Sequence, residues 1–255
     1  MIHLRTRAEM EAIARAGEIL VRLFAILPEQ VRPGVSTAAL DRFVDEFIRS
    51  HPGATPAFKG LYGFPASTCI SVNEEVVHGI PKPTRVLREG DLVSVDVGVR
   101  LDGWYADAAV TFPVGEIDAE AQRLLDMTRA ALAAGIAQAV PGRHLGDIGH
   151  AIQKTVEDAG FSVVRDLVGH GIGREPHEEP QVPNYGRPGR GLLLREGMVL
   201  AIEPMVNEGG PEVVTLPDRW TVVTADRRRS AHFEHTVAVT ADGPWVLTAP
   251  AGGQP

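Results

Sequence analysis

The tetrapeptide Leu-Arg-Glu-Gly occurs twice in this chain of 255 residues, at 87–90 and at 194–197. Each copy leads into an apolar, strand-like segment that one acid interrupts, Asp96 in the first copy and Glu203 in the second. The two acids stand at the same place in the repeat, which predicts two related halves in one folded unit. Burying an unpaired carboxylate costs several kcal/mol, so we expect both acids to face a common positive charge, of which a bound metal ion is the simplest.

Pro-Gly pairs at 33–34 and 141–142 support this duplication, because each lies between two helical patterns at nearly the same spacing as the tetrapeptides. A chance match of four residues is the alternative. We expect one domain over 1–248, with halves of about 1–113 and 114–248 and a frayed tail at 249–255. The periodicity predicts a helix that begins after Thr6 and ends before Pro28, further helices at 37–50, 119–139 and 146–159, and strands at 69–78, 92–100, 104–112, 198–206 and 231–240.

The composition restricts the class of protein. A net charge of −8 argues against a general nucleic-acid binder, and the basic run at 227–229 is expected to be a solvated loop. No apolar run approaches the ~20 residues that a membrane span needs, and the N-terminal segment lacks the apolar core of a secretory signal. The single Cys69 excludes an internal disulfide and fits a reducing cytosol. We therefore expect a globular cytoplasmic protein without a membrane segment.

The dipeptide Asp102-Gly103 is a strong hairpin signal between two alternating strands. With these two residues as the turn, Asp107 lies opposite Gly98, and Asp96 lies opposite Ala109. Both carboxylates then point to one face of the sheet, about 7–8 Å apart at Cβ. Either one of them is protonated or a cation lies between them; two exposed hairpin acids are the alternative interpretation.

Two further segments complete a candidate metal site: His170 in GHGIG and Glu234 in FEHTVAV. Taken alone, His170 fits a structural loop and Glu234 an edge strand. With Asp96, Asp107 and Glu203, however, four carboxylates balance the charge of two divalent ions, and one imidazole completes the set. This oxygen-rich set favours Mn, Fe or Co, and Zn also fits. Such an ion pair lowers the pKa of water from 15.7 toward ~7, which is hydrolase chemistry. HExxH, CxxC, GxSxG and Walker motifs are absent from the sequence.

Five segments of the chain resemble the type I methionine aminopeptidases of the bacterial kind. They are CISVNEEVVHGIP, DLVSVDVGVRLDGWYADAAVTF, GHGIGREPHEEP, MVLAIEPMV and WTVVTADRRRSAHFEHTVAVT. The resemblance covers nearly the whole chain. It implies the α+β pita-bread fold that this family shares with prolidase and aminopeptidase P, in which two pseudo-symmetric halves place their helices outside a curved, mainly antiparallel sheet.

The same resemblance implies a role for each metal ligand. Asp96 binds one of two divalent ions, Asp107 and Glu234 bridge both, and His170 and Glu203 bind the second. Glu203 is also implied to accept a proton and to pass it toward the leaving amine, a role that suits a carboxylate at the edge of a metal site.

Two histidines outside the repeat match the catalytic histidines of the family. His177, in PHEEP, corresponds to the residue that supports the scissile carbonyl and its oxyanion, and His78, in VHGIP, to the one near the leaving amide nitrogen. Without the resemblance, His78 would be interpreted as a core or turn residue and His177 as a surface residue.

The resemblance also implies a pocket for the side chain of the first substrate residue, and an unbranched thioether fits a slot lined by aromatic rings and sulfur. Plain core packing is the alternative for these aromatic residues. Phe64, Leu61 and Pro176 depart from residues common in the family, which leaves the shape of the pocket open. The implied lining is Phe58, Tyr62, Phe64, Cys69, His78 and Trp220.

The expected function is removal of the initiator methionine from nascent polypeptides whose second residue is small. The family implies a monomer, and the substrate implies transient contact with the ribosome, for which the run at 227–229 is the candidate. Two alternatives remain: an Xaa-Pro aminopeptidase of the prolidase kind, and a catalytically inactive pita-bread protein that binds nucleic acid or ribosomes.

Overall fold

The computed structural model describes residues 1–250, so most of the tail expected at 249–255 lies outside the described residues. The helices end within three residues of the predicted bounds. Thr6 and Glu9 form the expected capping box, in which each side chain accepts a hydrogen bond from the backbone N–H of the other. The α-helices are α1 (Arg7–Ile26), α2 (Thr37–Arg49), α3 (Ala119–Ile136) and α4 (Leu145–Asp158), and short 3-10 helices lie at Leu27–Glu29 and Leu61–Gly63.

Most strands join one antiparallel sheet of nine strands, ordered β1-β4-β5-β14-β9-β7-β8, with β2 paired to β4 and β15 paired to β14. Two smaller sheets are ordered β13-β10-β6 and β11-β12-β3. The strands are β1 (Ala54–Pro56), β2 (Cys69–Val72), β3 (Glu75–Val77), β4 (Leu92–Leu101), β5 (Trp104–Pro113), β6 (Ser162–Val163), β7 (Gly169–Gly171), β8 (Glu178–Val182), β9 (Val199–Ile202), β10 (Met205–Asn207), β11 (Val213–Thr215), β12 (Val222–Thr224), β13 (Ser230–His232), β14 (Glu234–Thr240) and β15 (Gly243–Val246).

Three predicted strands are each divided in two, which corrects their expected extent. The segment 69–78 turns at Asn73, whose φ is 57°, and separates β2 from β3. The segment 198–206 breaks at Glu203 and Pro204, and the segment 231–240 breaks at Phe233. In all three cases the chain leaves one sheet for another: β2, β9 and β14 belong to the nine-stranded sheet, whereas β3 belongs to one smaller sheet and β10 and β13 to the other. Both acids of the C-terminal half therefore lie where two sheets meet.

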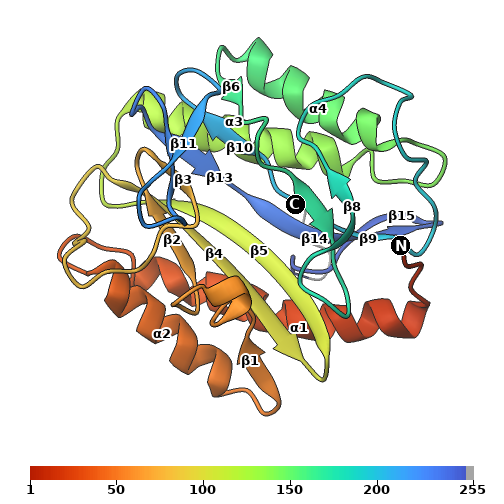
Figure 1. Cartoon of the computed structure of the whole chain (residues 1–255), viewed down its shortest axis with the longest axis horizontal. Helices are drawn as coiled ribbons and strands as arrows, with labels where there is room; N and C mark the ends of the chain where they lie inside the picture. The colour runs from red at the N-terminus through yellow and green to blue at the C-terminus, as the bar shows by residue number, and fades with distance from the viewer. Residues whose placement is uncertain (251–255) are drawn as a thin grey trace.

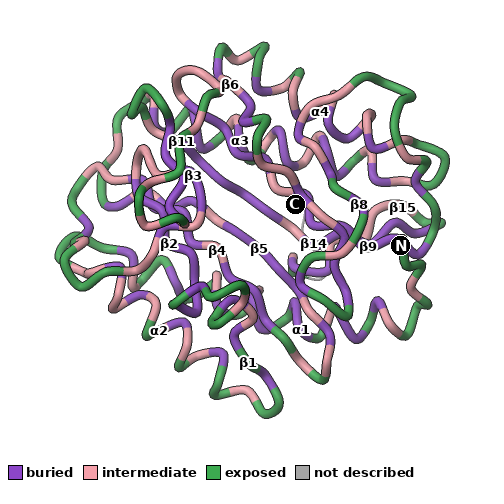
Figure 2. Tube along the Cα trace, in the orientation of Figure 1, coloured by how far each residue is buried: buried purple, intermediate pink, exposed green. Residues whose placement is uncertain are grey.

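The helices lie on the outside of the curved sheet, with α1 and α2 on one side and α3 and α4 on the other (Figure 1). One apolar core packs α1 and α2 against β4 and β5, and a second packs α3 and α4 against β9 and β14. The long strands between the helix pairs are buried along most of their length (Figure 2). No helix within residues 1–250 combines the length and the apolar character needed to cross a bilayer.

The repeated tetrapeptides make the same backbone contacts in both halves. The N–H of Gly34 donates to the carbonyl of Leu87 at 2.9 Å, and the N–H of Gly142 donates to the carbonyl of Leu194 at 3.0 Å. Each copy ends in a glycine with positive φ, 88° at Gly90 and 91° at the corresponding residue 197, a conformation that favours glycine. Strands β4 and β9 follow at equivalent positions, which places Asp96 and Glu203 at equivalent places in the fold.

Candidate metal centre and substrate pocket

The β4–β5 hairpin has the predicted register, with Gly98 opposite Asp107 and Asp96 opposite Ala109. Glu234 begins β14 and lies on the other side of Ala109 from Asp96. The small Ala109 side chain thus separates two acids on adjacent strands. The backbone at Asp107 is locked by Thr236, whose hydroxyl accepts from the Asp107 N–H at 3.0 Å and donates to its carbonyl at 2.8 Å. Three carboxylates are thereby presented on one face by neighbouring strands.

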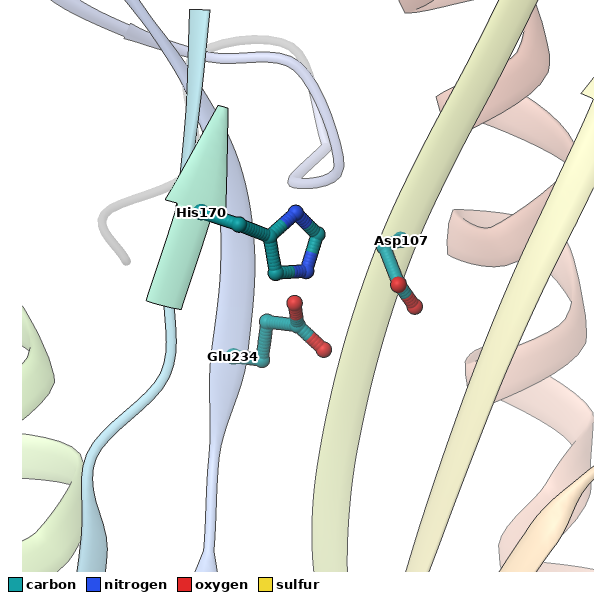
Figure 3. A group of neighbouring side chains, drawn as sticks. All are labelled: Asp107, His170 and Glu234. Atoms are coloured by element: carbon teal, nitrogen blue, oxygen red, sulfur yellow. The ribbon is translucent and has the colours of Figure 1, made fainter. Parts of the chain in front are cut away.

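His170 on β7 points toward Asp107 and Glu234 (Figure 3). Its ligand nitrogen and carboxylate oxygens of Asp107 and Glu234 all lie within 4.8 Å of one another. The Nδ1 atom lies 2.9 Å from the carbonyl of Gly171 and donates to it, which leaves the lone pair on Nε2. Nε2 lies 3.4 Å from Oε1 of Glu203. Asp96 lies beside Asp107 and lines the same cavity, so the five predicted ligands meet in one cluster. Among residues 1–250, Asp96 is not in either group of ligand atoms that lie within 4.8 Å of one another.

His232 is a member of this cluster that the sequence analysis did not identify. Its side chain is 1% exposed, and its Nε2 lies 3.3 Å from Oε2 of Glu203. With Glu203 and Glu234 it forms a second group that could hold a metal ion. No local signal identifies it, because the strand breaks at Phe233 and the alternation of side chains along one strand does not relate His232 to Glu234. Asn184, also not predicted, donates to the carbonyl of Glu203 at 3.1 Å.

The electrostatics of the cluster favour a bound cation. Burial raises the pKa of Asp107 to about 7 and that of Glu203 to about 7. Burial, followed by repulsion from neighbouring carboxylates, also raises the pKa of Asp96 and of Glu234. Within residues 1–250, one buried oxygen each of Asp96, Asp107 and Glu234 has no hydrogen-bond partner, and no Lys or Arg lines the surrounding cavity. Buried acids with unpartnered oxygens and a neutral imidazole fit divalent metal ions.

The cluster forms the floor of a cavity of about 530 Å³, which every residue of the predicted metal site and pocket lines. Phe64 and Trp220 meet edge to face at 5.1 Å between ring centroids. Phe58 packs into the space left by Gly98, where a Cβ atom would lie 2.8 Å from its ring. Burial raises the pKa of Cys69 well above its usual value, so this residue presents a neutral thiol.

Tyr62 is not a core residue, which excludes the alternative of plain core packing for its ring. It is 73% exposed and lies at the mouth of the cavity. Its ring stacks on His177 with the centroids 5.8 Å apart. Leu61 also lines the cavity, whereas Pro176 is not among the lining residues. Of the three departures from the family pattern, therefore, Phe64 and Leu61 bear on the shape of the pocket.

His78 and His177 both face the cavity and are uncharged at neutral pH. Burial, with a smaller contribution from His232, lowers the pKa of His78 to about 4. Burial and the neighbouring His78 lower the pKa of His177. The His177 ring lies edge-on to His170 at 4.5 Å between centroids. His177 is exposed, as the surface interpretation expected, and it also lines the cavity. His78 has the left-handed backbone of a turn residue, with φ at 58°, and lines the same cavity.

The basic run at 227–229 is only partly the solvated loop that was expected. Arg229 pairs with Asp118 at 2.7 Å and with Glu208 at 2.7 Å, which joins the start of β13 to the N-terminus of α3. Arg228 lies 3.7 Å from Glu208 and is more exposed. The third guanidinium of the run thus has a structural role.

The chain is similar in sequence and in structure to known proteins over nearly its whole length. The profile of "Metallopeptidase family M24" matches residues 11–241. A curated methionine aminopeptidase of Clostridium perfringens is 56% identical over 248 residues, which cover 97% of this chain and 99% of the relative. Crystal structures of methionine aminopeptidases from Thermotoga maritima and Rickettsia prowazekii are 48% and 43% identical, each with a TM-score of 0.95, over 98% and 97% of this chain and 100% of each relative. The expected pita-bread fold is confirmed by these two structures.

Proposed function

The chain belongs to metallopeptidase family M24, and on that premise we propose that Asp96, Asp107, His170, Glu203 and Glu234 hold two divalent metal ions. The protein is a metal-dependent aminopeptidase that removes the initiator methionine. The observation that carries the proposed ligand set is the convergence of buried carboxylate oxygens without partners at the floor of one cavity.

We assign Asp96 to one ion, Asp107 and Glu234 to both, and His170 and Glu203 to the second. When bound, the ions supply hydroxide at neutral pH and polarise the scissile carbonyl. Mn, Fe and Co suit this oxygen-rich set, and Zn also fits it.

Three side chains of the cluster move or hold protons around the substrate. Glu203 accepts the proton of the attacking water and passes it toward the leaving amine, a role that suits a carboxylate at the edge of the site. His177, neutral because of burial, donates an N–H to the scissile carbonyl as negative charge develops on the oxygen. His78, also neutral, contacts the leaving amide nitrogen.

The apolar end of the cavity accommodates the methionine side chain. Phe58, Phe64, Cys69 and Trp220 form this end, with Tyr62 at the mouth and His78 toward the cluster. A flexible thioether makes favourable contacts with ring edges and adapts to an irregular slot. The pocket therefore favours methionine over shorter or β-branched side chains.

The substrate also indicates where the protein works. We propose that it acts in the cytoplasm as a monomer on nascent polypeptides whose second residue is small, with transient contact to the ribosome. Arg227 and Arg228 remain the candidates for this contact, because Arg229 is held by two acids of the same chain.

The test uses protein stripped of metal and reconstituted separately with Mn, Fe, Co and Zn. Each form is incubated with Met-Ala-Ser, Met-Leu-Ser and Ala-Pro-Ser, and the products are followed by mass spectrometry. We expect rapid release of methionine from Met-Ala-Ser alone. Asp107→Asn should abolish this release, whereas Asp102→Asn, the same change at the exposed turn of the same hairpin, should leave it unchanged.

Each other outcome removes part of the proposal. Cleavage of Met-Leu-Ser at the same rate would contradict the preference for a small second residue. Full activity of Asp107→Asn would contradict the ligand set.

A further inference from the structure

The loop that carries His177 is fastened to the N-terminal segment of the chain. Glu178, directly after His177, accepts hydrogen bonds from the backbone N–H groups of Arg174 at 2.8 Å and Glu175 at 3.1 Å. The same carboxylate accepts from Nη2 of Arg5, at 2.7 Å to Oε1 and 2.5 Å to Oε2. One side chain thus closes the loop and joins it to a residue 173 positions earlier in the sequence.

This ion pair lies largely away from solvent. The Arg5 and Glu178 side chains are 8% and 10% exposed. A pair at this depth is sensitive to loss of one partner, because the other charge is left buried and uncompensated. Arg5 is itself held in place, because its backbone N–H donates to the carbonyl of Gly197 at 2.7 Å, just before β9. Gly173 allows the approach, since a Cβ there would lie 2.5 Å from Nη2 of Arg5.

Trp104 at the start of β5 provides a second attachment for the loop. The guanidinium carbon of Arg174 lies 3.7 Å from the Trp104 ring centroid, and that of Arg5 lies 5.3 Å from it. The N–H of Tyr105 donates to the carbonyl of Gly173 at 2.9 Å. Because β5 also carries Asp107, these contacts connect the loop to the strand that presents a proposed metal ligand.

The attachments fix where the His177 ring can lie. On one side the ring meets His170, and on the other it stacks with the exposed Tyr62. Tyr62 is open to solvent and cannot by itself hold the imidazole in one place. The position of the backbone on either side of His177, set by Glu178 and its partners, therefore determines where the imidazole points.

We propose that Arg5 and Glu178 are positioning residues that act through His177. They hold the loop so that the His177 N–H is aimed at the scissile carbonyl, although neither needs to touch the substrate. This inference rests on the proposed role of His177. It assigns the N-terminal segment, outside the metal cluster, a part in the chemical step.

The experiment is a double-mutant cycle with Met-Ala-Ser and the metal-reconstituted enzyme. Arg5→Met removes the charge and the donors but keeps an unbranched stem, and it is measured in the wild type and in His177→Ala. We expect kcat/KM to fall about tenfold in the first case, mainly through kcat, and to change less than about twofold in the second. Arg5→Lys should recover part of the loss. Arg7→Met, the same change at a neighbouring exposed arginine, should have no effect.

Glu178→Gln provides a second variant in case Arg5→Met fails to fold, because the amide oxygen can still accept from the loop N–H groups while the charge and the second acceptor for Arg5 are lost. It should show the same dependence on His177. Equal losses in the wild-type and His177→Ala backgrounds would overturn the proposal and leave a purely structural ion pair. No loss in the wild type would also overturn it. Full activity of His177→Ala alone would instead refute the proposed role of His177, so the two failures are distinguishable.

Discussion

The two halves of the molecule present their acids in different ways. In the N-terminal half, Asp96 and Asp107 come from β4 and β5, two strands of ten residues paired without interruption. In the C-terminal half, Glu203 follows the four-residue strand β9, and Glu234 begins β14 directly after the break at Phe233. The repeat thus keeps the position of the acid but not the continuity of the strand.

Two features explain why the strands are continuous in one half and interrupted in the other: the length of the acidic side chains and the passage of the chain between sheets. An aspartate on a continuous strand needs its Cα on the correct face, and the paired hairpin provides this. A glutamate has one more methylene and reaches the same cavity from the end of a strand. The strand breaks also allow the chain to pass into the smaller sheet, which brings His232 beside Glu203. The C-terminal half therefore surrounds its carboxylates with imidazoles, whereas the N-terminal half surrounds them with small residues.

The largest expected effect is on metal content and activity. It should differ between the acids proposed to bind both ions and those proposed to bind one. Asp107→Asn and Glu234→Gln should each lose most of both ions, and Asp96→Asn and Glu203→Gln should each lose one. In every case kcat/KM should fall on the order of 10³-fold or more, since each carboxylate supports several kcal/mol of catalysis. Metal content by mass spectrometry and calorimetric titration measure the stoichiometry.

Asp102→Asn is the control for this series and should retain both ions. If all four variants lost the same number of ions, the distinction between bridging and terminal acids would be wrong. If only the variants of Asp96 and Asp107 lost metal ions, the two halves would not contribute equivalent ligands.

The second expected effect tests whether the halves are equally stabilised by the repeat. Leu87 and Leu194 are each 1% exposed at equivalent places. Truncation of either to alanine should lower the free energy of unfolding by about 3 kcal/mol, from lost burial and the cavity left behind. Val86→Ala and Leu193→Ala change the preceding, exposed residues and should cost less than about 0.5 kcal/mol. Urea unfolding of the four variants measures this, and a large difference between Leu87→Ala and Leu194→Ala would show that one half dominates.

Features governed by short-range signals were predictable from the sequence. The Asp102-Gly103 turn determines the register of the hairpin, and the capping box of Thr6 and Glu9 determines where α1 begins. Because period-two alternation places Asp96 and Asp107 on one face, the placement of two of the five proposed ligands followed from local rules.

Features that depend on contacts between distant segments were not predictable. The break after Glu203 arises where two sheets diverge, and no signal near it apart from Pro204 indicates the change of sheet. His232 becomes part of the cluster only because β13 packs there. The contact of Arg5 with Glu178 joins segments 173 residues apart and has no counterpart in local periodicity.

A smaller effect concerns the protonation of the acids in protein stripped of metal. The folded state raises the pKa of Asp107 to about 7 from an ordinary 3.8, mainly through burial. Between about pH 4 and pH 7 the unfolded chain has released this proton while the folded protein holds it, so this residue lowers stability as the pH rises through that window. Asp107→Asn removes the titration. The free energy of unfolding of the variant, relative to that of the wild type, should therefore rise by on the order of 1–2 kcal/mol as the pH is raised from 4.5 to 8. The rise is limited because neighbouring carboxylates share the proton.

Urea unfolding of both metal-free proteins across this range measures the difference. The buried histidines titrate in both proteins and cancel from the comparison. With added Mn, the stability of the wild type should instead rise with pH, because bound cations favour the ionised carboxylates. A difference that does not vary with pH would show that Asp107 ionises normally in the fold.

The smallest expected effect lies at the helix N-termini that the repeat places in equivalent positions. Ser36 caps α2, because its hydroxyl accepts from the N–H of Ala39 at 3.2 Å. His144 occupies the same place before α4, where its own N–H donates to Asp147 at 2.7 Å. Ser36→Ala should lower stability by about 1 kcal/mol, and His144→Ser should raise it by roughly 0.5–1 kcal/mol, because a hydroxyl satisfies a further N–H of the first turn. Thermal unfolding detects both changes, and a loss of stability in His144→Ser would mean that the imidazole contributes more through packing than a cap can replace.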